Sequence, residues 1–507
     1  MSVPDAERAE GVETLGRRVA VSSAFMVAGR VTIRCIGVVS TLILARLLMP
    51  EDFGLIGLAA AAITIAEVLT QTNLGLAVVR RPVADRAIYD SAWTFNLLRC
   101  VLLGGGLAAT AGWQAELLGD PRIAPVVMVV GLTIALDGLG SAGIFRLQRE
   151  LRFHLIFRYE VVTKLFIFAV TIALAVMMQN YWCLVLGNLI GRCVSIPYGY
   201  WLAPHRPRFS FSAGWELLHF SKWMLVANAC SAIEGQAANL AIGRLVGLPA
   251  LGLWQLSWQV GAVPVTELAV PIRGPIYSGY AKVQEDRTLL RRHFLAGFGL
   301  ICAVLTPLSI GIALVAPEIE RIALGPAFAG AAPLIVYCAL YAFIDALAHF
   351  TFNLFIVLDA QRRMVAAHAA LVLVRVPAVI IGAMLAGAEG AGLALVVTAI
   401  FGFIAWHWQL ARLIGHGVAD LIGVSWRTIT AAALMVIAVT ALRALLPPAA
   451  GFGGTVLHLL AMMACGAAVH IGTQAILWRL CGAPDGAERH LISIAARLLP
   501  RWRRASA

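Results

Sequence analysis

Two arginines, Arg30 and Arg34, lie four residues apart in a long apolar segment near the N-terminus. Because an α-helix turns once in about 3.6 residues, their side chains would share one helical face. A third arginine, Arg273, lies between Pro271 and Pro275 in another apolar segment, where the prolines would free backbone groups for a ligand. The guanidinium group binds pairs of phosphate oxygens, so these three arginines are predicted to bind a diphosphate.

Other ionisable and polar residues also interrupt the apolar segments. A charge at the centre of a bilayer costs roughly 2.5–3.5 kcal/mol, so each is expected to face a cavity or a partner. Arg99 and Arg192 are further candidates for the cavity. A polar path or a site for a coupling cation is predicted for Glu67, Gln71, Asn228 and Glu234. Pairing between helices is the alternative, with candidate pairs Arg30–Glu67, Arg273–Glu267, Arg273–Glu234 and Arg375–Asp345.

The elements that must hold these residues follow from composition. The 507-residue chain is 60% hydrophobic and 13% charged, with a mean hydropathy of +0.85. Soluble chains carry about 25% charged residues, so most of the exterior is expected to face lipid. Backbone groups in lipid must bond internally, which leaves helices as the spanning elements. The sequence predicts an all-α integral membrane protein with about fourteen transmembrane helices, at 20–45, 53–78, 88–112, 122–145, 158–178, 180–203, 219–242, 250–276, 293–316, 328–357, 364–386, 390–411, 427–446 and 453–478.

Lysine and arginine alternate between the two ends of these helices. They concentrate in both tails and in every second loop, whereas the opposite loops carry only Arg46, Arg122, Arg244, Arg321 and Arg443. The positive-inside rule therefore predicts a multi-pass protein with both termini cytoplasmic. The formal net charge of +12 is explained by this alternation, and no nucleic-acid partner is predicted.

Short matches indicate that the chain is duplicated. Arg46 and Arg244 lie in similar stretches 198 residues apart, and Asp137 and Asp345 lie in similar stretches 208 residues apart. Helices 1–6 and 7–12 are therefore predicted to form two parallel six-helix lobes around a central cavity, with two extra C-terminal helices. The predicted parts are an N-tail (1–19), an N-lobe (20–203), a cytoplasmic linker (204–218), a C-lobe (219–413), the extra helices (426–480) and a basic cytoplasmic C-tail (481–507).

The repeated aspartates favour a structural or gating role. Asp137 and Asp345 are expected near the cytoplasmic ends of equivalent helices, where each could form a salt bridge, with Arg149 or Arg362 as partners.

Motifs for catalysis or metal binding are lacking in the sequence. The nine cysteines are scattered without zinc-ligand spacing, and there is no Walker A loop, HExxH motif or nucleophile elbow. Gly138, Gly140 and Gly143 spell GxGxxG, but they fall in a predicted apolar helix, where small residues favour close helix packing. No enzymatic activity, cofactor or metal site is predicted.

The stretch from Ile43 to Leu55 resembles the signature between helices 1 and 2 of polysaccharide-transport (Wzx-type) flippases. These belong to the multidrug/oligosaccharidyl-lipid/polysaccharide exporter superfamily. The stretch from Ile242 to Trp254 is similar to the second lobe of that family, and the resemblance runs from about residue 15 to residue 413. In the related lipid II flippases, arginines of helices 1, 2 and 8 line the cavity. Helices 1 and 8 match here by position, whereas helix 2 carries Glu67.

The resemblance implies a flippase in the bacterial inner membrane that exports undecaprenyl-pyrophosphate-linked oligosaccharide to the periplasmic leaflet by alternating access. Exopolysaccharide, capsule or O-antigen would be the product. Its implied partners are this substrate, membrane lipids, and a polysaccharide polymerase with its chain-length machinery. A multidrug/cation antiporter of the same superfamily is the alternative, although arginines at mid-membrane argue against cationic drugs. An assembly partner of a polymerase, without transport of its own, is a third hypothesis.

Overall fold

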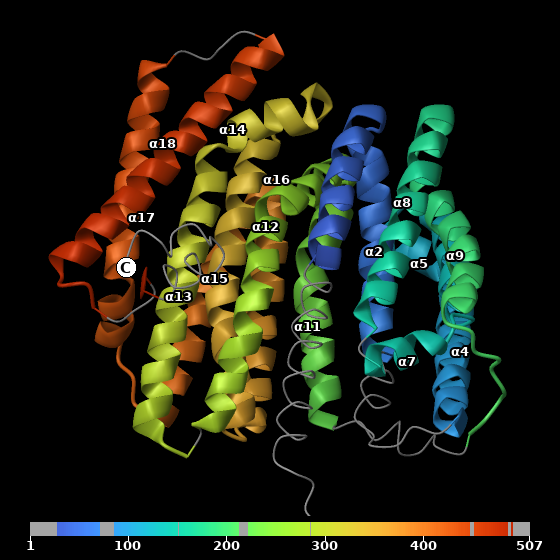
Figure 1. The fold of residues 1–507 in the computed structure, drawn as a ribbon. Helices are drawn as coiled ribbons and strands as arrows, with labels where there is room; N and C mark the ends of the chain where they lie inside the picture. Colours follow the sequence, from blue (N-terminus) through green and yellow to red (C-terminus); the bar gives the residue numbers. More distant parts are fainter. Residues whose placement is uncertain are drawn as a thin grey trace, which may run out of the picture. The chain divides into compact units, whose positions relative to one another are not determined.

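The computed structural model describes residues 28–70, 86–150, 152–211, 222–283, 285–446, 451–484 and 488–489, without the side chains of 222–227, 270–278, 281, 282, 353, 356 and 361. All regular structure in these residues is helical, which confirms the all-α prediction (Figure 1). The helices of the N-terminal half are Ala28–Leu47, α2 (Pro50–Thr70), α4 (Arg86–Ala109), α5 (Ala111–Leu118), α6 (Ile123–Asp137), α7 (Gly143–Arg149), α8 (Phe153–Met178) and α9 (Trp182–Leu202). Those that follow are α11 (Lys222–Ala241), η1 (Ile242–Val246), α12 (Leu248–Lys282), α13 (Arg287–Leu314), α14 (Ala316–Ile319), η2 (Glu320–Leu324), η3 (Pro326–Phe328), α15 (Ala331–Val357), α16 (Gln361–Ile414), α17 (Val418–Leu445) and α18 (Gly451–Leu480).

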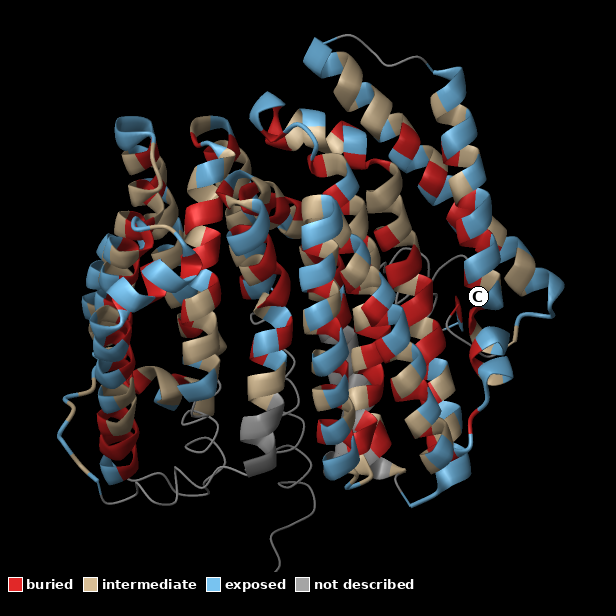
Figure 2. Cartoon of the chain, turned by 180° about the vertical axis from the view of Figure 1, so that it is seen from behind, coloured by how far each residue is buried: buried red, intermediate tan, exposed pale blue. Residues whose placement is uncertain are grey.

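The surface of these helices is that of a membrane protein. Among the described residues, nine helices have the length and hydropathy of a membrane span. Large apolar side chains are exposed on them, such as Met177 (80% exposed) and Leu385 (81%). Figure 2 shows exposed and half-buried residues along most of α17 and α18. Apolar surface on this scale is stable only in lipid, so the chain is a multi-pass membrane protein.

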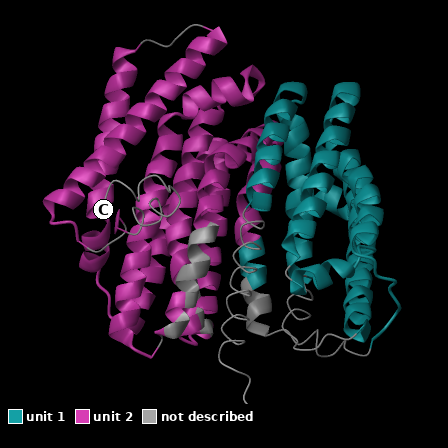
Figure 3. Cartoon of the chain, viewed as in Figure 1, with its two compact units in different colours: residues 1–232 teal, residues 233–507 magenta. Residues whose placement is uncertain are grey.

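The chain divides into two compact units, residues 1–232 and 233–507 (Figure 3). The division falls within α11, beyond the predicted linker at 204–218. The helices of the two units start at matching intervals. α12 begins 198 residues after α2, and α15 and α16 each begin 208 residues after α6 and α8. These intervals equal the spacings of the sequence matches, so the duplication extends to the helices themselves.

A break inside α16 falls at the same interval. Ala386 and Gly387 depart from helical geometry, and Gly387 has a φ of +60°. Gln179, 208 residues earlier, has a φ of +48° and caps the end of α8. Both units therefore end a helix with a left-handed residue, which reverses the chain for the next span. The break separates the predicted helices 364–386 and 390–411.

The stretch that carries the family signature forms a fixed junction in unit 1. α2 begins at Pro50, whose fixed φ suits the first helical position. Asp52 accepts hydrogen bonds from the backbone N–H of Met49 (3.0 Å) and of Tyr181 (2.9 Å). One carboxylate thus caps α2 and ties it to the start of α9.

The predicted helix at 122–145 is shorter in the structure, because α6 ends at Asp137. The GxGxxG glycines lie in the turn that follows and at the start of α7, not inside a helix as predicted. Space explains two of them. A Cβ on Gly138 would lie 2.9 Å from the Cβ of Cys100, and one on Gly143 would lie 2.4 Å from the carbonyl oxygen of Ala203.

Candidate functional site

Positive charges gather where the helix Ala28–Leu47 lies against α8 in unit 1. A Cβ at Gly29 would lie 4.0 Å from the carboxylate of Glu160. Arg30 interacts electrostatically with Glu160, and Arg34, one turn further on, interacts with Lys164, one turn beyond Glu160. Arg30 and Arg34 are both exposed. This face therefore carries three cations and one acid, and the like charges of Arg34 and Lys164 lie in electrostatic range of each other.

A second group of charges in unit 1 is balanced. It takes one residue from each of four helices: Glu67 of α2, Arg99 of α4, Asp137 of α6 and Arg192 of α9. Arg192 Nε lies 2.8 Å from Asp137 Oδ1, and Glu67 interacts electrostatically with both arginines. Two arginines and two acids compensate each other here, so this group suits packing and positioning better than the capture of an anion.

Unit 2 contains a buried polar cluster centred on Glu234. Its carboxylate shares a hydrogen bond of 2.5 Å with His368 Nε2 and accepts another from Arg375 Nη1. Arg375 is 1% exposed and also donates to Tyr341 Oη at 2.9 Å, while its Nη1 lies 3.9 Å from Asp345 Oδ1. Helices α11, α15 and α16 each contribute to the cluster, because pairing offsets the cost of taking these charges out of water.

The wall of this cluster leaves little free space. His349 Nδ1 lies 3.2 Å from Asp345 Oδ2, and the rings of Phe352 and Trp406 line the same cavity, which measures about 10 Å³. That volume holds at most one water. The guanidinium of Arg375 already lies between the two carboxylates. In the described part of the chain, no three His, Cys, Asp or Glu side chains are grouped to hold a metal ion.

The charges of this cluster do not cancel. With Arg375 charged and both histidines neutral, the carboxylates of Glu234 and Asp345 leave one net negative charge. An uncompensated charge is costly in a medium of low dielectric, and one proton would neutralise it. The geometry therefore suits reversible proton binding, with His368 and Glu234 sharing the proton across a short hydrogen bond.

The predicted site residues are thus distributed over the two units. Arg30 and Arg34 face α8, where Glu160 is the acid beside Arg30. Asp137 pairs with Arg192, and the predicted pair of Arg375 and Asp345 is confirmed. Asn228 lies half-buried in α11. Gln71 and the side chain of Arg273 lie outside the described residues.

Sequence reasoning missed two members of the buried cluster, His368 and Tyr341. His368 lies seven residues, or two helical turns, before Arg375, and Tyr341 lies one turn before Asp345. Both pairs share a helical face with a charge that was singled out. That spacing was available in the sequence, although only the structure joins α15 and α16 to Glu234.

Repeated helical units with ionisable residues inside their spans define a polytopic membrane protein of transporter type. The chain belongs to the family described as polysaccharide biosynthesis protein, whose model matches residues 43–333. It is 21% identical to the lipopolysaccharide biosynthesis protein WzxC of Escherichia coli, over 73% of this chain and 76% of that protein. It is 23% identical to the succinoglycan biosynthesis transport protein ExoT of Rhizobium meliloti, over 59% of this chain and 61% of that protein.

Among solved structures, the fold is similar to the lipid II flippase MurJ in an inward closed conformation. The TM-score is 0.72, with 90% of this chain and 99% of that chain covered, at 12% sequence identity. At this identity the likeness concerns the fold alone. Together with the matched family, it confirms the membership that the stretch from Ile43 to Leu55 predicted.

Proposed function

We propose that this protein moves a polyprenyl-pyrophosphate-linked oligosaccharide from the cytoplasmic to the periplasmic leaflet of the bacterial inner membrane. The observation that carries this proposal is the surplus of positive charge on the face of Arg30, Arg34 and Lys164. Cations at membrane depth are costly unless an anion compensates them. A diphosphate carries about two negative charges and offers oxygen pairs to guanidinium forks. The family membership supports a polysaccharide precursor as the cargo.

Alternating access of the two repeated units is the proposed mechanism. The arginine face binds the diphosphate while the site is open to the cytoplasm, and the prenyl tail stays in lipid. Export of about two negative charges from an interior at about −100 mV releases roughly 4–5 kcal/mol over a cycle. Both termini are cytoplasmic in this proposal, as the alternation of lysine and arginine predicts.

The coupling ion in this proposal is a proton. Glu234 and His368 share a buried hydrogen bond in a cluster that lacks one positive charge, and a cavity of about 10 Å³ leaves no room for a hydrated metal ion. All the ionisable groups that face this site are on three helices, α11, α15 and α16: Glu234, Tyr341, Asp345, His349, His368 and Arg375. Protonation would release Glu234 from His368 and so favour one of the two access states.

Deletion of the gene tests this assignment against its alternatives. We expect lipid-linked oligosaccharide to accumulate in the cytoplasmic leaflet, and the wild-type gene to restore export. A deletion strain that exports the intermediate but leaves it unpolymerised would favour the polymerase partner. Altered drug sensitivity with normal surface polysaccharide would favour the antiporter.

A further inference from the structure

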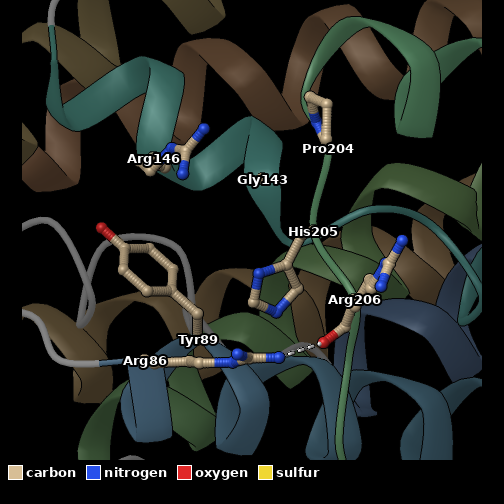
Figure 4. Close-up of a pocket in the computed structure, with 7 residues that line it drawn as sticks. All are labelled: Arg86, Tyr89, Gly143, Arg146, Pro204, His205 and Arg206. Carbon is tan, nitrogen blue, oxygen red and sulfur yellow. Dashed lines mark hydrogen bonds between the residues drawn. The ribbon is translucent and has the colours of Figure 1, made fainter.

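A pocket of about 440 Å³ lies in unit 1 between the start of α4, the helix α7 and the segment that follows α9 (Figure 4). Each of these three segments contributes an arginine to the lining: Arg86, Arg146 and Arg206. They belong to three separate parts of the sequence that were each predicted to be cytoplasmic. The fold therefore concentrates positive charge from three loops around one hollow.

The floor of the pocket is fixed by a buried acid. Asp90 Oδ1 lies 3.0 Å from His205 Nε2 and accepts the backbone N–H of Arg208 at 3.2 Å. Arg86 Nε lies 3.6 Å from the same carboxylate, and its Nη2 donates to the carbonyl oxygen of Arg206 at 3.1 Å. These contacts hold the imidazole and one guanidinium in place before any ligand arrives.

The opposite wall is open to an anion. Figure 4 shows Arg146 above the imidazole of His205 and Arg86 below it, with the ring of Tyr89 at one side, while the side chain of Arg206 points away. Arg146 is 48% exposed, and its Nε lies 3.6 Å from Glu150, which is beyond hydrogen-bonding distance. Two guanidinium groups and a phenol thus surround a space that suits a phosphate.

Exposed aromatic side chains place this pocket at the surface of the bilayer. Trp201, at the end of α9, is 69% exposed, and the guanidinium of Arg158 lies 5.3 Å from its ring. Phe209, in the segment that carries His205, is 73% exposed and contacts Trp93 edge-on. Aromatic rings beside basic residues are typical of the level of the lipid head groups.

We propose that this pocket binds the phosphate of an anionic phospholipid head group from the cytoplasmic leaflet. Basic pockets between spanning helices on this side of a membrane recognise such head groups. The site is built within unit 1 and is separate from the arginine face of Arg30 and Arg34. The bound lipid joins α4, α7 and the segment after α9 by one anion, and so stabilises the folded unit.

Thermal unfolding of the purified full chain in neutral detergent tests the proposal. We expect phosphatidylglycerol to raise the Tm, whereas phosphatidylcholine and inorganic phosphate at the same concentration leave it unchanged. The double variant Arg86→Gln/Arg146→Gln should bind phosphatidylglycerol roughly thirtyfold more weakly, at roughly fivefold for each arginine. Arg412→Gln, an exposed arginine of unit 2 stacked on Trp408 (3.6 Å), is the control and should keep the full shift.

Native mass spectrometry of the single variant Arg146→Gln keeps the test independent of folding, because Arg146 pairs only loosely with an exposed acid. We expect it to retain less phosphatidylglycerol than the wild type and the control. Equal Tm shifts with both lipids, or full retention by the arginine variants, would overturn the proposal. A shift with inorganic phosphate alone would overturn the lipid as the source of the anion.

Discussion

Glu234 and His368, 134 residues apart in the chain, share a buried hydrogen bond of 2.5 Å between α11 and α16. The same carboxylate accepts Arg375, so one acid joins an imidazole and a guanidinium inside unit 2. Because the neighbouring Asp345 adds a second negative charge, the cluster lacks one positive charge. This relationship connects proton binding to the packing of three helices.

Replacing Glu234 by glutamine should uncouple transport from the proton. The amide keeps the size of the side chain but neutralises the cluster, so no proton is needed for charge balance. We expect the rate of translocation in proteoliposomes to fall at least about tenfold and to lose its response to an imposed pH gradient. Glu116→Gln, at an exposed acid of α5, is the control. An unchanged response to the gradient in Glu234→Gln would exclude the cluster as the coupling site.

Removing Arg375 should destabilise unit 2. Arg375→Leu leaves two carboxylates buried without their cation, which typically costs about 3–5 kcal/mol. The double variant Arg375→Leu/Glu234→Gln removes one of these charges and should recover part of the loss. Chemical denaturation in detergent measures both effects. Equal stability of the wild type and the single variant would contradict the buried ion pair.

Two adjacent glycines of α4 should behave differently. A Cβ on Gly104 would lie 2.2 Å from the carbonyl oxygen of Gly131 in α6, whereas one on Gly105 meets nothing within 4 Å. We expect Gly104→Ala to lower the free energy of unfolding by about 1–3 kcal/mol through forced separation of the helices. Gly105→Ala should leave it unchanged. Similar unfolding curves for the two variants would refute the close approach of α4 and α6.

Acid should weaken the junction between α16 and α17. Burial lowers the pKa of His416 in the turn Gly415–Gly417, where its ring lies beside that of Phe294. The unfolded chain therefore takes up this proton first, so the stabilisation is present above a pH of about 6.5 and is lost as the pH falls below it. We expect the Tm of the wild type to fall between about pH 7.5 and 5.5, and His416→Asn to reduce that fall. An identical pH dependence in the variant would disprove the assignment.

Periodicity and repeats in the sequence predicted the helical fold and the duplication, because apolar runs and matching residues record both directly. The break at Gly387 was predictable from the neighbouring Glu389 and Gly390, which interrupt an apolar run. The end of α6 at Asp137 was not, since it depends on the space that Gly138 and Gly143 leave for α4 and the end of α9.

The pairing of charges was harder to predict than their presence. Arg30 was paired with Glu67 as one alternative, whereas the structure brings Glu160 beside it. The rotation of each helix about its axis decides which charges meet, and apolar periodicity is weak in helices that are hydrophobic on every side. His368 was treated as solitary for the same reason, although its spacing from Arg375 placed both on one face.

Translocation by the purified chain in proteoliposomes tests the central proposal most directly. The substrate is a polyprenyl-pyrophosphate-linked oligosaccharide with a labelled sugar, and the measured quantity is the labelled fraction that a non-permeant reagent reaches after transfer across the bilayer. We predict transfer by the wild type and by Arg412→Ala, none by Arg30→Ala/Arg34→Ala, and partial transfer by Arg30→Lys/Arg34→Lys, which keeps the charge but not the guanidinium fork. Transfer by the folded double-alanine variant at the wild-type rate would contradict the account.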